Sequence, residues 1–195
     1  MILEPNQRGQ IMPLPVVLIS TISQDGVHNA APWSCVTPIL RPLDEVLIAS
    51  WLKRDTLENI RQTGEFVINV PPAGMEEAVM ICTKKFPPKV DELEKAGLAP
   101  RRSKMVLAPG IEGCLAWAEC TVEEEIAREK FVLIIGKVMH LEADDRFFSE
   151  SEGLDYERAK PLCSMSGPIG MQFVRPVFTG KGDRYAAGPG TPNAD

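Results

Sequence analysis

The sequence predicts a mainly β fold, an antiparallel β-barrel of six or more strands with a few short helices. Three observations support this prediction. Short runs of β-branched and apolar residues recur along the first half of the chain, separated by turn residues. Strand and helix segments do not alternate regularly, which argues against a parallel Rossmann-type sheet. Two longer extended segments, 113–126 and 131–141, have the length of strands that bend around a Greek-key barrel.

The first hairpin begins with a strand predicted over residues 15–22 (PVVLISTI). Asp25-Gly26 follows, and this pair supplies the positive φ that a tight turn needs. The returning strand is expected over 27–31, ending where Pro32 removes a ladder donor. The stretch 29–39 (NAAPWSCVTPI) is rich in proline and small residues and is expected to be irregular, and such backbone on a rigid scaffold is a common place for a ligand.

The next elements are a strand over 45–51 (EVLIASW), a helix over 55–63 and a strand over 66–70 (FVINV). Asp55 or Thr56 is expected to cap the helix at its N-terminus, and Gly64 is placed to end it.

The middle of the chain contains two further predicted helices, over residues 74–83 and 90–96. Pro87-Pro88 separates them and prevents one continuous helix. The two long strands follow, and the tail from Gly180 onward is rich in Gly, Pro and Ala. We expect one domain over residues 1–195, with a core from about 13 to 185 and a loosely held tail over 186–195.

Composition excludes several classes of function. The chain has 195 residues and a net charge of −6, with no basic run, so a nucleic-acid partner is not expected. No segment has the roughly 20 apolar residues of a membrane span, and the N-terminus lacks the apolar core of a signal peptide. Five cysteines without a C-x-x-C pair indicate reduced thiols in a cytoplasmic protein, and two histidines make a multi-histidine metal centre improbable.

Several candidate functional residues have a structural alternative. His28 and His140 are interpreted as partly exposed strand residues, because no G-x-S-x-G elbow accompanies them. Cys35 could be redox-active or metal-binding, but we favour a small residue that lets backbone approach a ligand. Trp33 and Trp51 could be core aromatics or could flank a flat ligand, and the sequence leaves both open. Gly180-Lys181-Gly182 lacks the strand–turn–helix context of a phosphate loop and is interpreted as a turn.

The order of motifs resembles that of the flavin reductase-like, FMN-binding split-barrel family, which includes the flavoredoxins. Segments 13–39 and 46–70 match a pattern of an apolar strand, a d-G-x-x-N-x-A turn, a Ser-containing loop, R-x-T-x-x-x-I and g-e-F-v-v-N. The matching residues here are Asp25, Gly26, Asn29, Ala31, Ser34, Pro38, Arg54, Thr56, Ile60, Gly64, Glu65, Phe66 and Asn69. Segment 89–100 (KVDELEKAGLAP) resembles the family's D-K-F-E-x-A-G-L, but Glu92 and Leu93 stand where Lys and Phe are usual. The resemblance extends to RPVFTGKGDRY and covers about Pro13 to Tyr185.

This resemblance implies a split barrel that binds FMN and forms a homodimer, with NADH or NADPH as co-substrate. It implies that the loop after the second strand lies along the flavin ring, while Lys53, Arg54 and Thr56 hold the phosphate at a helix N-terminus. Without this resemblance, Lys53 and Arg54 would be interpreted as part of a solvated loop. The expected cofactor-binding residues are Trp33, Ser34, Cys35, Val36, Thr37, Ser50, Trp51, Lys53, Arg54, Thr56, Asn59 and Tyr185, and Cys163–Gly167 is a further candidate to cover a site.

Three functions remain open on the sequence. The first is an NAD(P)H-dependent, FMN-binding oxidoreductase of the flavin reductase type, in which no protein residue is expected to act as a catalytic acid or base. The second is a flavoredoxin-type electron-transfer flavoprotein without a nicotinamide site. The third is a split-barrel binding protein that lacks redox activity, because a fold does not guarantee an activity.

Overall fold

The computed structural model describes residue 2 and residues 4–40, 43–167, 170–177 and 179. Its centre is one seven-stranded, wholly antiparallel sheet with the strand order β3-β2-β6-β9-β10-β5-β4. The mainly β, split-barrel fold predicted from the sequence is therefore confirmed. In chain order these strands are β2 (Val17–Ile22), β3 (His28–Trp33), β4 (Val36–Pro38), β5 (Glu45–Trp51), β6 (Glu65–Val70), β9 (Ala116–Ala127) and β10 (Phe131–Ala143).

The two edge strands of this sheet, β3 and β4, follow one another in the chain. Only Ser34 and Cys35 lie between them, so the sheet curls until its edges are joined by two residues. No ladder joins β3 to β4 in the described part of the chain, and the barrel is split along this line.

The ends of β3 and β4 differ from the sequence prediction. The irregular stretch expected over 29–39 is mostly strand, because β3 runs through Pro32 to Trp33 and β4 begins at Val36. Pro32 is tolerated because β3 pairs only with β2, and an edge strand does not need every N–H.

Helix α1 (Asp55–Thr63) has the predicted bounds. Gly64 ends it in the left-handed conformation, with φ of 73°, and its N–H bonds Ile60 O. The predicted N-cap is wrong: Arg54 holds that position, and its side chain makes no capping bond. The hydroxyl of Thr56 instead donates to Asn29 Oδ1 on β3, at 2.8 Å.

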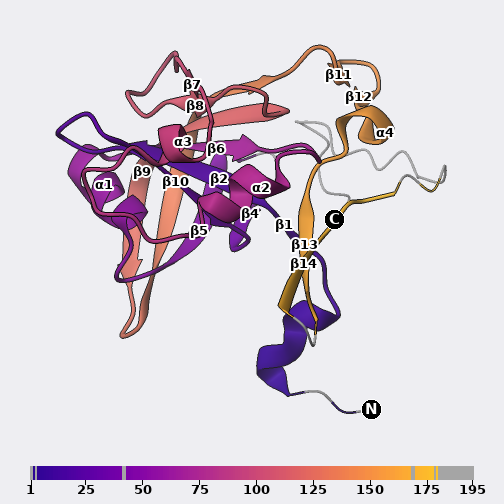
Figure 1. Ribbon diagram of the computed structural model, residues 1–195, viewed down its shortest axis with the longest axis horizontal. Coiled ribbons are helices and arrows are strands. Elements are labelled where there is room, and N and C mark those ends of the chain that lie inside the picture. The colour runs from indigo at the N-terminus through magenta and orange to yellow at the C-terminus, as the bar shows by residue number, and fades with distance from the viewer. Residues whose placement is uncertain (1, 3, 41–42, 168–169, 178, 180–195) are drawn as a thin grey trace, which may run out of the picture.

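Helices α2 (Glu76–Ile81) and α3 (Glu92–Lys95) are shorter than predicted but occupy the predicted segments. Both contact β3, and Figure 1 shows them over the same part of the sheet. The long strands form the predicted hairpin, with register shifts at Ile135/Gly136 and Val138/His140 that bend it. Gly136 is required at the first of these, because a Cβ there would lie 2.5 Å from Phe66 Cζ.

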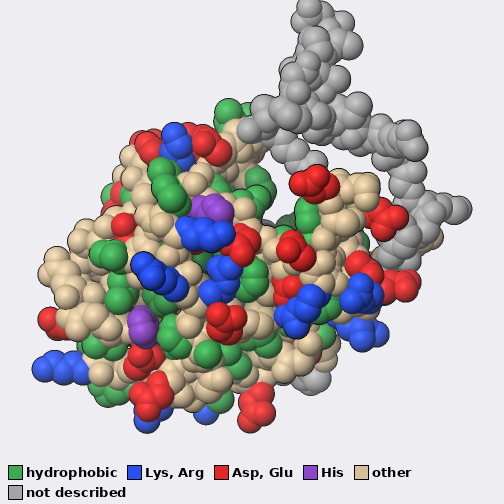
Figure 2. All heavy atoms as spheres, turned by 90° about the horizontal axis from the view of Figure 1, so that it is seen from above, with side chains coloured by type: hydrophobic (Ala, Val, Ile, Leu, Met, Phe, Trp, Pro, Cys, Tyr) green, Lys and Arg blue, Asp and Glu red, His purple; other side chains and the backbone are tan. Residues whose placement is uncertain are grey.

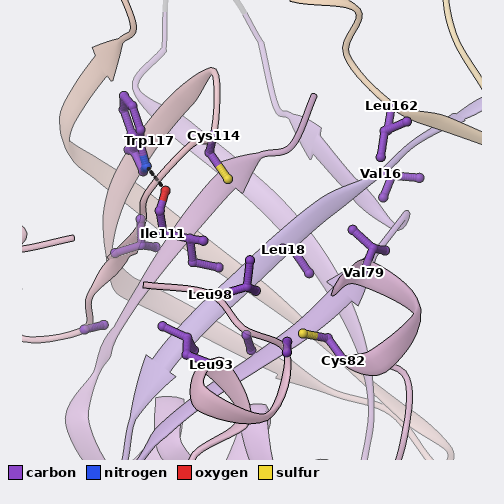
Figure 3. Packing of buried hydrophobic residues seen from close by; sticks show 14 of the residues in the cluster. Val16, Leu18, Val79, Cys82, Leu93, Leu98, Ile111, Cys114, Trp117 and Leu162 are labelled. Atoms are coloured by element: carbon purple, nitrogen blue, oxygen red, sulfur yellow. Dashed lines mark hydrogen bonds between the residues drawn. The ribbon is translucent and has the colours of Figure 1, made fainter. Parts of the chain in front are cut away.

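The core consists of two clusters on opposite sides of β2 and β6. Ile19 and Phe66 belong to the cluster that packs against α1, whereas Leu18 and Val67 belong to the other. Figure 3 shows this second cluster, in which Val79 of α2 and Leu93 of α3 cover the sheet. Burial on both faces explains why β2 and β6 are apolar over consecutive residues.

The remaining short elements lie outside the central sheet. A three-stranded sheet and the 3₁₀-helix η1 (Pro5–Gln10) form an arm that extends away from the barrel in Figure 1. We use the name arm for these elements: η1, β1 (Leu14–Pro15), β13 (Cys163–Gly167) and β14 (Gly170–Val174). Short two-stranded ladders and one helix complete the fold: β7 (Pro100–Arg101), β8 (Gly110–Ile111), β11 (Phe148–Ser149), β12 (Gly153–Leu154) and α4 (Tyr156–Ala159).

The face seen in Figure 2 carries acidic and basic side chains that are interspersed with hydrophobic ones. Among the described residues, none of the helices has both the length and the apolar character needed to cross a membrane.

Candidate functional site

The first feature of the site is a cavity at the split of the barrel, which we call the split cavity. It has a volume of about 270 Å³. Its walls come from the end of β3, the β3–β4 connection, the end of β5 and the residues after α2: Ala31, Pro32, Trp33, Ser34, Cys35, Ala49, Trp51, Arg54, Cys82 and Thr83. Most of these side chains are small, so the backbone of both edges is accessible to a ligand.

Two tryptophans belong to the wall of the split cavity. Trp51 ends β5 and its surface is 63% exposed, which is unusual for so large an apolar residue. The indole Nε1 of Trp33 is buried and has no hydrogen-bond partner among the described residues. Buried indole N–H groups usually have an acceptor, so this unpaired donor is an exception.

The split cavity brings together four predicted ring-binding residues: Trp33, Ser34, Cys35 and Trp51. The other three lie beside it within strands and are absent from its lining. Val36 packs against the barrel core, the hydroxyl of Thr37 bonds Pro38 O, and the buried Ser50 hydroxyl donates to Trp51 O.

A second cavity, of about 470 Å³, adjoins the first, and we call it the basic cavity. Both cavities share Ala31, Arg54, Cys82 and Thr83 in their walls. Four cationic side chains line the basic cavity, and they come from two segments: Lys53, Arg54, Lys84 and Lys85. The three residues predicted to bind phosphate, Lys53, Arg54 and Thr56, therefore line the same cavity. Lys84 and Lys85 were missed, although a Thr-Lys-Lys run between a helix and a proline pair could have indicated an anion site.

Helix α1 points its N-terminus at the basic cavity, because Arg54, Asp55 and Thr56 all line it. The first N–H groups of a helix lack intrahelical partners, and no side chain caps them here at the N-cap position. Backbone donors, the helix dipole and nearby cations together favour a bound anion such as a phosphate.

Buried side chains connect the helix to the sheet beneath this cavity. Thr56 donates to Asn29 Oδ1, and Asn59 Nδ2 donates to Thr21 Oγ1 at 3.0 Å. Asn59 does not line the basic cavity but a third one, of about 300 Å³, which also borders Asn29 and which we call the polar cavity. Thr56 and Asn59 thus fix the position of α1 against β2 and β3.

The acidic start of α3 borders the basic cavity through Glu92, and sequence reasoning missed it. Asp91 caps the helix by accepting the Glu94 N–H at 3.0 Å, and its other oxygen lies 2.9 Å from His28 Nδ1. Glu92 is buried, and its Oε2 accepts the Ala30 N–H at 3.2 Å. The signal was present, since Glu92 departs from the Lys of the family motif.

Burial raises the pKa of the Glu92 carboxyl to about 7. The hydrogen bonds from Ala30 and Asn29 oppose this rise in pKa, and the neighbouring charges of Asp55 and Asp91 add to it. The pKa of the Cys82 thiol rises to about 12, mainly through burial and also through the charge of Glu92.

The remaining predicted site residues lie elsewhere. Tyr185 and the Gly180-Lys181-Gly182 turn lie outside the described residues. Cys163–Gly167 forms β13 of the arm, and none of its residues lines the three cavities. The described residues contain no group of three or more His, Cys, Asp or Glu side chains placed to hold a metal ion.

Comparison with known proteins gives a consistent result. A family model described as "Flavin reductase like domain" matches residues 8–161. An uncharacterized protein of Methanothermobacter thermautotrophicus is 45% identical over 192 residues, which cover 96% of this chain and 91% of that protein.

Two solved structures share the fold. The flavoredoxin of Desulfovibrio vulgaris (Miyazaki F) superposes with a TM-score of 0.82 at 17% identity, covering 97% of this chain and 100% of the other. Nitrilotriacetate monooxygenase component B from Bacillus cereus gives a TM-score of 0.80 at 22% identity, and the match covers 91% of this chain and 96% of the other.

Proposed function

The chain belongs to the flavin reductase-like family, and from this membership we propose that it is an FMN-binding oxidoreductase that uses NADH or NADPH. One observation carries the proposal: a cavity with small walls and two tryptophans opens directly into a cavity with four cations. A flavin mononucleotide has the same division, a planar ring joined to a phosphate. The two cavities together fall within the roughly 300–1,000 Å³ of typical ligand pockets.

We assign the flavin ring to the split cavity. Ala31, Ser34 and Cys35 are small enough to let a flat ring approach the backbone at the split. The exposed Trp51 is available to cover a ring face. Within this proposal Val36, Thr37 and Ser50 contribute through their strands, and Tyr185 remains a candidate from the tail.

We assign the phosphate to the basic cavity. Lys53, Arg54 and the N-terminus of α1 supply charge-assisted donors from one side, with Thr56 beneath them. Lys84 and Lys85, added by the structure, supply charge from the segment after α2. Asn59 acts indirectly, by holding α1 in place through Thr21.

A bound flavin supplies the electron-transfer chemistry, and the protein supplies position and electrostatics. The residues of the split cavity orient the ring, and the basic cavity fixes the phosphate so that one part of the ring stays accessible. None of the cavity residues is assigned a role as catalytic acid or base.

A homodimer in the cytoplasm is part of the proposal. The arm extends from the barrel. The arm and the residues next to its strands expose four large apolar side chains, which favours burial against a second copy: Ile11, Met12, Met171 and Val177. All five cysteines are free, which suits a reducing compartment.

A flavoredoxin-type electron carrier is the second candidate, and the fold similarity to the Desulfovibrio flavoredoxin favours it. A binding protein without redox activity is the third.

The test is an absorption spectrum of the purified protein with FMN, followed by anaerobic addition of NADH or NADPH. The oxidoreductase proposal predicts a bound flavin whose visible absorption bleaches with at least one nicotinamide. Bound flavin that dithionite bleaches but neither nicotinamide does would favour the electron carrier. Failure to bind any flavin would refute both.

A further inference from the structure

Glu92 places a carboxyl in a cavity whose function needs positive charge. It is the first residue of α3, its surface is 6% exposed, and it lines both the basic cavity and the polar cavity. A phosphate in the basic cavity therefore has this buried carboxyl as well as cations around it, and the carboxyls of Asp55 and Glu58 also line the cavity.

Among the described residues, no cation neutralises the carboxyl directly. Within the described part of the chain, Glu92 forms no ion pair with Lys, Arg or His. Its hydrogen-bond donors are the Ala30 N–H and the amide of Asn29, both uncharged. Its charged neighbours Asp55 and Asp91 are acids, and they make a negative charge on Glu92 more costly still.

We propose that Glu92 takes up a proton when a phosphate-bearing flavin enters the basic cavity, so that FMN binds as the protonated-Glu92 complex. The proposal rests on the function proposed above, because it needs the flavin phosphate in this cavity. The proton comes from solvent and adds to a carboxylate oxygen, and no bond in the flavin changes.

The physical reason is that two anions in one partly enclosed cavity repel each other, whereas a protonated carboxyl does not and can donate a hydrogen bond. A phosphate monoester, with a second pKa of about 6, is dianionic above neutral pH. Burial already raises the pKa of Glu92 to about 7, so protonating it in the complex requires little free energy near neutrality.

Other titratable and charged groups face these two cavities, and control variants are needed to distinguish Glu92 from them. They come from the turn before β3, β3 itself, the segment before α1, α1, the segment after α2 and the loop before α3: Asp25, His28, Lys53, Arg54, Asp55, Glu58, Cys82, Lys84, Lys85, Lys89 and Asp91. Glu92→Gln keeps one side-chain oxygen that can accept the Ala30 N–H, and it removes the titrating group. His28→Gln removes the nearby imidazole, and Glu94→Gln changes an exposed carboxyl on the same helix.

The experiment is calorimetric titration of each protein with FMN at about pH 8, in two buffers with different enthalpies of ionisation. The difference between the buffers gives the number of protons bound. A second series measures the dissociation constant from about pH 6 to 9. Riboflavin, which lacks the phosphate, is titrated in parallel. Circular dichroism and melting curves check that each variant is folded.

The wild type and the His28→Gln and Glu94→Gln variants are expected to take up a proton, in part or in full, with FMN but not with riboflavin. Their FMN affinity should fall by up to about tenfold per pH unit above neutrality. Glu92→Gln should take up none and lose most of this pH dependence.

FMN binding without proton uptake in the wild type, or unchanged uptake in Glu92→Gln, would overturn this inference and leave the proposed function intact. Loss of uptake in His28→Gln would transfer the role to that imidazole and would also overturn it. If neither flavin binds at any pH, the proposed function fails and this inference fails with it.

Discussion

Replacement of Arg54 by alanine is expected to weaken FMN binding without unfolding the protein. Arg54 lies at the junction of the split and basic cavities and lines both. Its side chain is exposed and makes no capping bond for α1. Its contribution to the helix is made by the backbone, since its carbonyl accepts the Glu58 N–H at 3.1 Å and its extended φ and ψ are open to alanine.

The magnitude follows from the loss of one hydrogen bond to a charged group, about 1.5–3 kcal/mol. The dissociation constant for FMN should therefore rise by about 10- to 150-fold. Riboflavin affinity should change much less, because the lost contact is with the phosphate. The assay is the quenching of flavin fluorescence on titration with protein, in a buffer without phosphate at fixed ionic strength.

Arg128→Ala is the matched control, because Arg128 is an exposed arginine in the turn between β9 and β10 and lines none of the three cavities. It should bind FMN like the wild type. Unchanged FMN affinity in Arg54→Ala would show that the phosphate lies elsewhere. An equal loss for FMN and riboflavin would assign Arg54 to the ring instead.

Three further predictions concern stability and reactivity. Gly136→Ala should lower the free energy of unfolding in urea by about 1–3 kcal/mol, because its Cβ would collide with Phe66; a wild-type midpoint would contradict the close packing. Glu92, whose pKa rises from 4.5 to about 7 on folding, adds stability that is fully present below pH 4.5 and lost as the pH rises through about 7. Glu92→Gln should therefore lack a decline of about 3 kcal/mol in unfolding free energy across that range, and parallel curves for both proteins would refute the assignment. Iodoacetamide should modify the exposed Cys35 first, and bound FMN should slow this reaction. Three buried thiols have a pKa raised to about 12: Cys82, Cys114 and Cys120. If these thiols reacted as fast as Cys35, their burial would be contradicted.

The sequence was sufficient for features determined by local chemistry. Asp25-Gly26 indicated the first hairpin, and Gly26 has the positive φ of 81° that this requires. Gly64 marked the end of α1 for the same reason. Local rules failed where tertiary context decides. Pro32 suggested the end of a strand, but its strand is an edge and continues. Thr56 suggested a cap, but its hydroxyl has a partner on β3.

The candidate site was partly predictable for a similar reason. Lys53 and Arg54 could be found because they precede a recognisable helix start, where an anion site is a general expectation. Lys84 and Lys85 could not be assigned to the same cavity, because only the packing of α2 against β3 brings their segment there. The arm was also missed, since its strands pair segments at opposite ends of the chain and neither has a strong strand pattern.

The topology of the sheet explains why the candidate site lies where it does. A seven-stranded sheet whose first and last strands are consecutive in the chain must leave two edges facing each other across a short connection. Unpaired backbone groups gather there, and an edge that is left unpaired invites a partner. Within the proposed function, the flavin ring would satisfy those groups without closing the barrel. Helix α3 then brings Glu92 to the wall of the adjoining basic cavity, so a single departure from the family motif changes the charge of the site itself.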